Sequence, residues 1–422
     1  MLEQRNNSLG GTSFMADYLE NLTSLPFAPL GIIAMPGCEE IGKRIDYYLT
    51  KWRKERDSEF RDDARFVAYE RDTYMIDISC PRFGSGEAKG VIRQSVRGLD
   101  IYIICDVFNH TLTYKMYGQT VPMSPDEHFA DLKRIIGAIA GKAKRITVVM
   151  PMLYEGRQHK RSARESLDCA MMLQELVNIG VSNLITFDAH DARVQNAIPL
   201  HGFDNVQPTY QMIKALIRNI PDLTLNADHV TIVSPDEGGM SRCMYFSSVL
   251  KLDLGMFYKR RNYAVIVDGR NPIEAHEYLG KPVEGKDVII VDDMISSGDS
   301  IIDIAEKLKI RGAKRIFAFA SFGLFCNGLK KFDEAYSAGI LNKVFTTNLI
   351  YRPQELLDRP WYCEVNMCKY VAYIIDTLNH DNTISNLLNP VTRIHNLLEK
   401  QNQKIGAMQL TIDHDTDSEI KG

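Results

Sequence analysis

Two neighbouring carboxylates, Asp292 and Asp293, begin a run of residues that is suited to binding a sugar phosphate. The apolar residues before them, 288–291, predict a buried strand, and the small residues after them predict a tight loop. This loop consists of Ser296, Ser297, Gly298, Asp299 and Ser300. Carboxylates accept hydrogen bonds from sugar hydroxyls, and the backbone N–H groups of such a loop attract a phosphate, as does the helix N-terminus behind them.

The same loop permits a plainer interpretation, in which an ordinary turn leads into a helix. Ser297, Asp299 or Ser300 would then cap a helix that begins near Ile301. Short motifs of this kind also occur by chance, so the loop alone leaves both interpretations open.

The residues that follow the loop favour the ligand-binding interpretation. Apolar residues recur at helical spacing from 301 to 308, and Gly312 stands where helices commonly end. Residues 316–320 then predict a second strand. The segment therefore predicts a strand–helix–strand unit whose first turn can receive a ligand.

A second segment, after the predicted strand 230–233, combines paired glycines with a carboxylate. Asp236, Gly238 and Gly239 stand between this strand and a predicted helix. Glycines let the backbone approach an anion closely, and Asp236 offers the oxygen ligands that Mg²⁺ prefers. An ordinary turn between a strand and a helix is the alternative.

Asp188 and His190 follow another predicted strand, 184–187. Alternate residues of an extended chain point to the same side, so both side chains could face one metal–nucleotide site. An isolated Asp-x-His sequence also serves in structural hydrogen bonding, which is the alternative.

Cations gather in two further segments, each after a predicted strand. Residues 157–164 include Arg157, Lys160, Arg161 and Arg164, and residues 259–261 are Lys259, Arg260 and Arg261. Such side chains could hold a polyphosphate, whereas the alternative for each segment is a solvated basic loop, or for the first a weak nucleic-acid patch. Because ligands bind beyond the carboxyl ends of parallel strands, the joint occurrence of these segments favours a phosphate-binding site.

Strands and helices alternate along most of the chain. Strands are expected at 30–35, 66–69, 74–80, 101–105, 146–150, 184–187, 230–233, 255–258, 288–291 and 316–320, and helices at 39–54, 128–140, 167–179, 210–218, 239–250 and 301–308. This alternation predicts the α/β class, with two doubly wound, mostly parallel sheets.

The expected organisation has four parts, namely an N-terminal extension (1–28), an N-terminal α/β domain (29–205), a C-terminal α/β domain with the sugar-phosphate loop (206–398) and a polar tail (399–422). Residues 107–126 and 268–285 lack clear periodicity and are expected to be insertions, the second a long loop or lid.

The composition limits the possible partners and compartment. With a formal net charge of -4, the chain has no bulk attraction for nucleic acid or anionic membranes. No apolar run approaches the ~20 residues that span a bilayer. The eight cysteines are scattered without a zinc-binding spacing, as in proteins of a reducing compartment. We therefore expect a cytoplasmic protein with neither nucleic acid nor membrane as a partner.

In their order along the chain, these segments resemble the ribose-phosphate pyrophosphokinase family, also called phosphoribosyl-pyrophosphate (PRPP) synthetases. The resemblance extends from about residue 30 to 398. Further matches are Phe83 to Glu87, Ser95 to Gly98, Arg157-Gln158, Asp188-Ala189-His190, Asp204-Asn205, Lys259 with Arg261, and Thr346 to Asn348. The resemblance implies sheets of the phosphoribosyltransferase-like type.

It also implies an enzyme that transfers the β,γ-pyrophosphoryl group of Mg-ATP to the 1-hydroxyl of ribose 5-phosphate, giving PRPP and AMP. The implied ATP-binding residues are Ser85, Glu87, Arg157, Gln158 and His190. The implied ribose-5-phosphate residues are Asp292, Asp293 and the loop Ser296, Ser297, Gly298, Asp299 and Ser300, and the implied pyrophosphate loop contains Asp236, Gly238 and Gly239. Mg²⁺ is expected near Asp188, His190 and Asp236, and Lys259 and Arg261 are the expected catalytic residues. The resemblance further implies a homo-oligomer, a hexamer or its dimeric unit, with an ATP site that draws on a neighbouring subunit.

Four residues depart from the family pattern. Ser297 and Ser300 stand where Thr is usual, Asp299 where Gly is usual, and His159 where Asp is usual. Asp299 brings a carboxylate beside an expected phosphate, which is unfavourable unless its side chain turns away or caps the helix. Asp299, His159 and the insertions leave open a catalytically weak regulatory homologue. A phosphoribosyltransferase-type protein is a second alternative, for which the loop from Asp292 to Ser300 would suffice.

Overall fold

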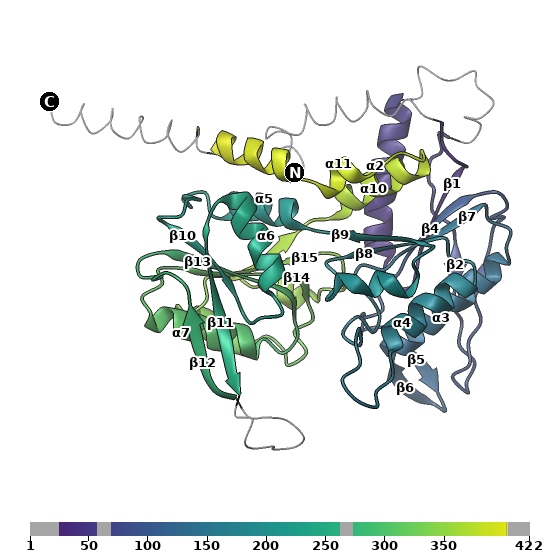
Figure 1. The fold of residues 1–422 in the computed structure, drawn as a ribbon. Coiled ribbons are helices and arrows are strands. Elements are labelled where there is room, and N and C mark those ends of the chain that lie inside the picture. Colours follow the sequence, from purple (N-terminus) through teal and green to yellow (C-terminus); the bar gives the residue numbers. More distant parts are fainter. Residues whose placement is uncertain (1–24, 57–68, 262–272, 402, 404–422) are drawn as a thin grey trace. The chain divides into compact units, whose positions relative to one another are not determined.

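The structure is a computed structural model that describes residues 25–56, 69–261, 273–401 and 403, apart from the side chains at 259–261 and 273–276. The chain folds into two compact α/β units (Figure 1). The described residues within 1–207, 348–351 and 366–388 form the first unit, and those within 208–347, 352–365 and 389–422 form the second. The division into continuous domains at 29–205 and 206–398 remains a prediction. In the structure, residues 348–351 and 366–388 belong to the first unit, although they follow residues of the second unit in the chain.

The first unit is built on a parallel sheet in the strand order β1-β4-β7-β8-β9. Its strands are β1 (Leu30–Ala34), β4 (Asp100–Ile104), β7 (Arg145–Val149), β8 (Asn183–Phe187) and β9 (Gly202–Val206). Its helices are α2 (Glu39–Arg56), α3 (Pro125–Ile139), α4 (Asp168–Asn178), the 3-10 helix η3 (Ala192–Ala197), α10 (Cys368–Asn379) and α11 (Ser385–Leu388). Two short antiparallel pairs, β2 (Ile78–Ser79) with β3 (Val91–Ile92) and β5 (Thr113–Met116) with β6 (Gln119–Pro122), lie outside this sheet.

The winding of this sheet reverses direction at β1. After β1 and α2, the chain returns at Met75, which forms a parallel bridge with Ile32. Hydrogen bonds on both sides of the bridge support it, because Ile32 N donates to Tyr74 O at 2.8 Å and Ile76 N donates to Ile32 O at 2.7 Å. The chain then enters β4, which pairs with β1 in parallel. The predicted doubly wound parallel sheet is therefore confirmed for this unit.

The second unit is built on a larger sheet in the strand order β12-β11-β10-β13-β14-β15-β16. Its strands are β10 (Val230–Ser234), β11 (Asp253–Arg261), β12 (Ile273–Leu279), β13 (Asp287–Ile295), β14 (Ile316–Gly323), β15 (Lys343–Thr347) and β16 (Tyr362–Val365). Its helices are α5 (Thr209–Asn219), α6 (Met240–Leu250), α7 (Asp299–Ile310), α8 (Lys330–Ser337) and α9 (Gln354–Leu357). Only the pairing of β11 with β12 is antiparallel, so this sheet is also mostly parallel, as predicted.

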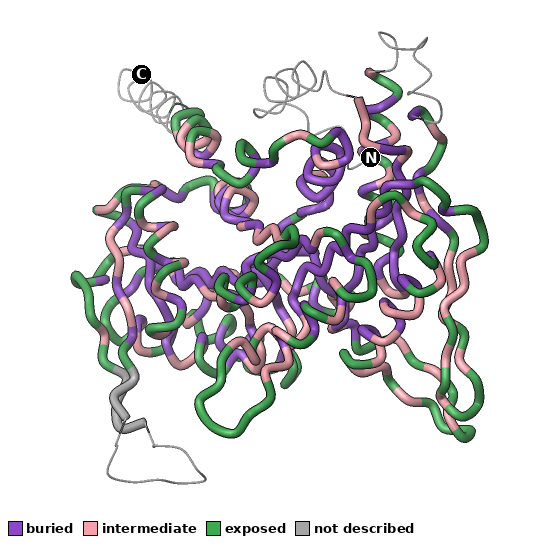
Figure 2. Tube along the Cα trace, turned by 45° about the vertical axis from the view of Figure 1, so that its right-hand side comes forward, coloured by how far each residue is buried: buried purple, intermediate pink, exposed green. Residues whose placement is uncertain are grey.

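The central strands of both sheets are buried on both faces, which explains their continuous apolar sequences. All residues of β4, β10 and β14 are buried. Figure 2 shows this burial along the strands, with exposed residues in the connecting loops. The two apolar cores are separate, one formed by the first sheet with α3 and α4, the other by the second sheet with α7 and α8.

The prediction of a long loop or lid at 268–285 is wrong for the residues that form β12. This strand pairs with β11 in antiparallel fashion, from Met256 opposite Leu279 to Arg261 opposite Ile273, with a register shift between Arg260 and Arg261. Gly280, directly after β12, makes room for an aromatic ring, because a Cβ there would lie 2.7 Å from the hydroxyl of Tyr278. Residues 262–272 lie outside the described chain.

The expected insertion at 107–126 contains a β-hairpin, β5–β6, joined by Tyr117 and Gly118. Both turn residues have positive φ, 47° and 78°, as in the tight turns that fit the twist of a hairpin. A helix over 391–401 includes the first residues of the expected polar tail (399–422), and Gln401 is buried. Most of the expected strand 66–69, most of the expected N-terminal extension and residues 404–422 lie outside the described chain.

A buried ion cluster joins α2 to α10 in the first unit. Arg53 Nη2 lies 3.0 Å from Asp376 Oδ1 and also donates to Asn379 Oδ1 at 2.7 Å, and Arg56 pairs with the other oxygen of Asp376. Arg53 and Asp376 are fully buried. Burial alone would raise the pKa of Asp376, but the charges of Arg56 and Arg53 outweigh it and hold this pKa well below its usual value.

Replacing Asp376 with Asn should lower the free energy of unfolding of the first unit by about 3–5 kcal/mol, because two arginines lose their buried partner. Chemical denaturation followed by the fluorescence of Trp52, with Trp361 of the second unit replaced by Phe, measures this. Because the folded pKa of Asp376 is depressed, its contribution is complete above about pH 4 and is lost as the pH falls further. The Asn variant should therefore show the weaker acid dependence.

Asp72→Asn is the matched control, since Asp72 pairs with Lys54 at 3.2 Å on the surface and its side chain is 98% exposed. The expected loss for this variant is below about 1 kcal/mol. Equal losses in the two variants would contradict the assignment of the cluster.

Candidate active site

The two adjacent carboxylates lie inside a strand rather than after it. β13 continues to Ile295, because β14 pairs with it from Ile316 to Gly323. Asp292 stands opposite Ala320 in this ladder. The prediction that the strand ends at residue 291 is therefore wrong, since it followed the apolar run and not the length of the neighbouring strand.

Asp292 and Asp293 influence each other electrostatically. Asp293 is 5% exposed, and its backbone N–H donates to Asp292 Oδ1 at 2.8 Å. Burial, together with the charge of Asp293, raises the pKa of Asp292 well above its usual value. Two such carboxylates are stabilised by added hydrogen-bond donors, and the hydroxyls of a sugar are donors of this kind.

The loop between β13 and α7 turns at Gly298 in the left-handed conformation, with φ of 85°. A Cβ here would lie 2.3 Å from the ring of Phe332 in α8. Gly298 also occupies the N-cap position of α7, and it has no side chain to cap the helix. The prediction that Asp299 or Ser300 caps the helix is therefore wrong. The hydroxyl of Ser297, one residue before the N-cap, accepts a hydrogen bond from Asp299 N at 3.4 Å.

Asp299 is exposed in the first turn of α7, where its carboxylate pairs with Lys331 of α8. The hydrogen bond from Lys331 lowers the pKa of Asp299, as does the hydroxyl of Ser297. The carboxylate is therefore engaged by a neighbouring helix rather than by the end of its own helix.

The loop after β10 is organised by Asp236. Its Oδ1 accepts hydrogen bonds from the backbone N–H groups of Gly238 at 3.0 Å and Gly239 at 3.2 Å. The hydroxyl of Ser234 donates to the carbonyl of Asp236 at 2.7 Å. A Cβ at Gly239 would lie 2.9 Å from that hydroxyl, so the loop is compact only with glycine there.

These two loops lie at neighbouring strand ends in the second unit. β10 and β13 are adjacent and parallel, with Val233 opposite Ile290. From β10 the chain proceeds through α6 to β11 on one side, and from β13 it proceeds through α7 to β14 on the other. Strand order therefore reverses between β10 and β13, and ligands of open α/β sheets bind beyond the carboxyl ends of strands at such a point.

The first unit brings a second group of predicted residues together, at the adjacent ends of β7 and β8. The ring of His190 lies 5.3 Å from the ring of His159, measured between centroids. His159 Nε2 is 3.5 Å from Asp191 Oδ2. Asp188 is buried and has the unusual φ of 43°, a strained conformation for a residue with a side chain.

Asp191 had not been identified in the sequence, although it directly follows His190. It accepts hydrogen bonds from the side chain of Arg193, and this contact holds the pKa of Asp191 far below its usual value. The only signal in the sequence was the charge pair Asp191 and Arg193, directly after Asp188-Ala189-His190.

In the predicted cationic loop, Arg157 is exposed, and Gln158 N donates to Glu155 O at 2.8 Å.

Ser85 and Glu87 lie on an exposed turn of the first unit, where the hydroxyl of Ser85 donates to Glu87 Oε2 at 2.8 Å. The hairpin β5–β6 supports this turn, because Tyr117 N donates to Gly84 O at 2.8 Å. The hairpin therefore positions two of the predicted nucleotide-binding residues.

Lys259 and Arg261, the predicted catalytic residues, are described by their backbone alone. The backbones of Lys259 and Arg261 belong to β11, but their side chains lie outside the described part of the chain. Among the described residues, no cluster of three or more His, Cys, Asp or Glu side chains could hold a metal ion.

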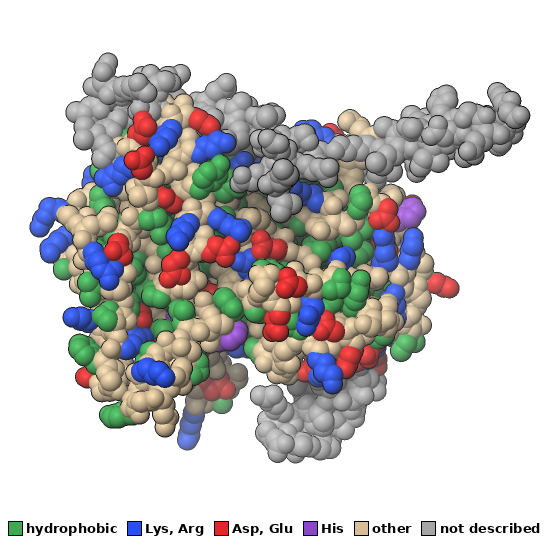
Figure 3. All heavy atoms as spheres, turned by 180° about the vertical axis from the view of Figure 1, so that it is seen from behind, with side chains coloured by type: hydrophobic (Ala, Val, Ile, Leu, Met, Phe, Trp, Pro, Cys, Tyr) green, Lys and Arg blue, Asp and Glu red, His purple; other side chains and the backbone are tan. Residues whose placement is uncertain are grey.

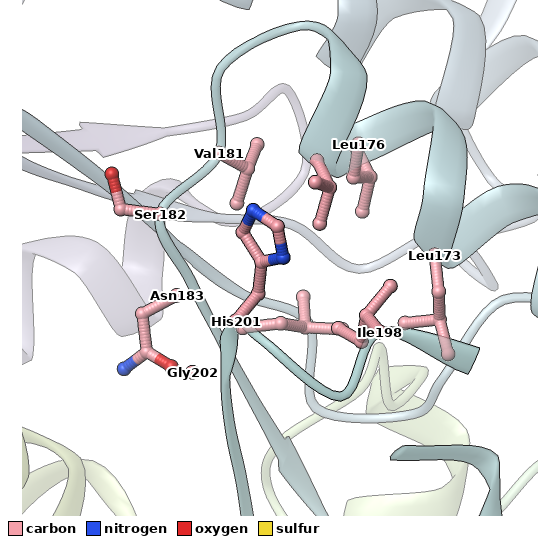
Figure 4. Close-up of a pocket in the computed structure, with 10 residues that line it drawn as sticks. Leu173, Leu176, Val181, Ser182, Asn183, Ile198, His201 and Gly202 are labelled. Atoms are coloured by element: carbon pink, nitrogen blue, oxygen red, sulfur yellow. The ribbon is translucent and has the colours of Figure 1, made fainter. Parts of the chain in front are cut away.

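A small apolar pocket lies elsewhere in the first unit, at the amino ends of β8 and β9 (Figure 4). The ring of His201 lies there beside Leu176 and Val181. Because ligands of parallel sheets bind at the carboxyl ends, this pocket is not the candidate active site.

Charged side chains of both signs are interspersed among the described residues on the face shown in Figure 3. This face therefore has no large field of one sign. None of the helices in the described part of the chain has the length and apolar character needed to cross a membrane.

Comparison with known proteins identifies the family. Residues 32–180 match the N-terminal domain of ribose phosphate pyrophosphokinase, and residues 203–336 match the phosphoribosyl transferase domain. A ribose-phosphate pyrophosphokinase of Vibrio cholerae is 30% identical over 319 residues, which are 74% of this chain and 91% of that protein. The chain belongs to the ribose-phosphate pyrophosphokinase family. A relative of the same name from Vibrio parahaemolyticus is 29% identical over 317 residues, with the same coverage.

The fold agrees with this assignment. The crystal structure of phosphoribosylpyrophosphate synthetase from Mycobacterium smegmatis superposes with a TM-score of 0.66, over 84% of this chain and 99% of that chain, at 19% identity. The predicted family and the predicted phosphoribosyltransferase-like sheets are therefore confirmed. The roles of individual residues in this pyrophosphokinase remain predictions.

Gly298→Ala should lower the free energy of unfolding of the second unit by about 3 kcal/mol. Roughly 1–2 kcal/mol comes from the left-handed backbone, and the rest from the clash with Phe332. Gly339→Ala is the matched control, because φ is 67° there but no described atom lies within 4 Å of the added Cβ. Its expected loss is about 1 kcal/mol. Denaturation followed by the fluorescence of Trp361, with Trp52 replaced by Phe, compares the two variants, and equal losses would exclude the clash.

Proposed function

We propose that this protein transfers the β,γ-pyrophosphoryl group of ATP to the 1-hydroxyl of ribose 5-phosphate, forming PRPP and releasing AMP. The observation that carries the proposal is the parallel pairing of the adjacent strands β10 and β13, whose carboxyl ends lead into the loops 234–239 and 296–300. One loop suits a sugar phosphate and the other a pyrophosphate, so the acceptor and the transferred group would lie side by side.

In this proposal, the second unit holds the acceptor sugar. Asp292 and Asp293 accept hydrogen bonds from the 2- and 3-hydroxyls of the ribose. The backbone of 296–300 and the N-terminus of α7 bind the 5-phosphate. Gly238 and Gly239 allow the loop after β10 to approach the pyrophosphate closely.

The first unit would hold the nucleotide. Ser85 and Glu87 contact the adenine from their exposed turn, and Arg157, Gln158 and His190 contact the phosphates. The neighbouring ends of β7 and β8 support this role, because they bring the rings of His159 and His190 within 5.3 Å. Asp191 and Arg193 would position His159, since Asp191 lies within 3.5 Å of it.

Mg²⁺ bound with the nucleotide would neutralise phosphate charge during the transfer. Asp188 in the first unit and Asp236 in the second offer the carboxylate oxygens that this ion prefers, whereas the imidazole of His190 suits it less well. Protein sites for Mg²⁺ commonly use one or two carboxylates together with substrate phosphates, so the residues fit an ion that arrives with its nucleotide.

The chemical step needs positioning and charge stabilisation more than a strong base. The nucleophile is the 1-hydroxyl oxygen, which forms a bond to the β-phosphorus while the bond to the α-phosphate oxygen breaks. Lys259 and Arg261 would stabilise the negative charge that accumulates around the transferred group.

A phosphoribosyltransferase would use the loop 296–300 but would leave the match of residues 32–180 to a pyrophosphokinase domain without a role.

All eight cysteines are free thiols. They support the inference that the protein acts in the cytoplasm.

Lys259→Ala and Arg261→Ala should each lower kcat by roughly 100-fold or more without lowering the free energy of unfolding, because they act on charge that develops in the transition state. The assay contains ATP, Mg²⁺ and ribose 5-phosphate, and measures PRPP and AMP. Arg260→Ala removes an equal charge from the residue between them and should retain most activity. Wild-type turnover in the Lys259 or Arg261 variant would contradict their assignment, and a wild-type chain without PRPP formation would favour a regulatory homologue.

We also infer that the protein is a homo-oligomer whose ATP site draws on a neighbouring subunit. A mixture of the Glu87→Ala and Lys259→Ala proteins, dissociated and reassembled together, should then regain part of the wild-type activity. A mixture of Glu87→Ala with Ser85→Ala should remain inactive, because both changes affect the same turn. Light scattering gives the mass of the assembly, and a monomer would exclude the inference.

A further inference from the structure

One ion pair stands directly at the proposed phosphate loop. Asp299 begins α7, and its carboxylate pairs with the ammonium group of Lys331, from α8. Both side chains are about half exposed, at 53% and 56% respectively. Exposed pairs contribute little to folding stability, so stability does not account for the placement of this pair.

The rest of α8 holds Lys331 firmly beside the loop. Phe332, the next residue, is buried, and its ring fills the space that a Cβ at Gly298 would need. Trp361 stacks on the ring of Phe332 at 5.3 Å between centroids and donates to Asp333 Oδ1 at 2.7 Å. Two successive residues of α8 therefore support two successive residues of the loop.

The charge of Asp299 opposes the binding of a phosphate at the start of α7. Positive helix ends and backbone N–H groups attract a phosphate there, whereas a carboxylate in the first turn repels it. Lys331 makes the pair neutral, and the hydrogen bond that it donates keeps the pKa of Asp299 low. Without Lys331, one uncompensated negative charge would remain beside the bound phosphate.

We propose that Lys331 is a positioning residue that sets the affinity of the 296–300 loop for the phosphate of the acceptor sugar by neutralising Asp299. The inference rests on the proposed function, since it assigns the phosphate of ribose 5-phosphate to this loop. It concerns a phosphomonoester and leaves the nucleotide side of the reaction unchanged.

The test changes the net charge of the pair by substitution and measures the KM for ribose 5-phosphate. Lys331→Met leaves a net negative charge and should raise this KM on the order of fivefold, with little change in kcat or in the KM for ATP. Asp299→Asn leaves a net positive charge and should lower the KM. The double variant is neutral and should return the KM toward the wild-type value. The differences should shrink as the salt concentration increases.

Lys330→Met is the matched control. Lys330 precedes Lys331 on the same helix, is 88% exposed and faces Glu334 at 3.7 Å rather than Asp299. Its loss should change the KM for ribose 5-phosphate less than twofold. An unchanged KM in Lys331→Met would overturn the proposal, as would a double variant that retains the raised KM of Lys331→Met.

Calorimetric titration of each variant with ribose 5-phosphate, without ATP, separates this inference from the proposed function. If the variants bind in the expected order while the wild-type chain forms no PRPP, the inference stands and the proposed reaction fails. If PRPP forms normally and the affinities do not follow the charge of the pair, the inference fails and the reaction stands. Thermal unfolding of each variant excludes a general loss of structure.

Discussion

The parallel pairing of β10 with β13 is the constraint on which the proposed acceptor site depends. Strand order reverses between these two strands, so the connections that leave them diverge and their carboxyl ends stay uncovered by a crossover. The backbone ladder therefore brings together two loops that are about 60 residues apart in the chain, with Val233 opposite Ile290. Neither loop could form half of a bi-substrate site if one of the strands were displaced in the sheet.

The loops themselves depend on close contacts with glycine and on hydrogen bonds within the backbone. Gly239 lies against the hydroxyl of Ser234, and Gly298 lies against the ring of Phe332. Asp236 holds its own loop through two backbone N–H groups. A binding loop built in this way is ordered before its ligand arrives, which lowers the entropic cost of binding a small anion.

The ion pairs of the two units differ in how far they are buried. In the first, the buried cluster around Asp376 joins α2 to α10 and is a matter of stability, since an unpaired arginine there would be costly. At the proposed phosphate loop, Asp299 and Lys331 are exposed, and in our proposal their charges act on the ligand that binds beside them. The same kind of contact therefore has a structural role where water is excluded, and the proposal gives it a role in recognition where water is present.

The sequence by itself determined the fold class, because apolar runs and turn residues report strands and helices directly. It also determined the family, through the resemblance of its motifs in their order along the chain. It did not reveal that β13 continues through Asp292 and Asp293, since the length of a strand depends on the partner beside it, here β14. It also did not reveal β12, whose pairing with β11 is a contact between segments separated by residues rich in turn signals. Only the tertiary structure decided that Asp299 meets Lys331 and that Gly298 meets Phe332, because α8 reaches the loop through packing that no local pattern encodes.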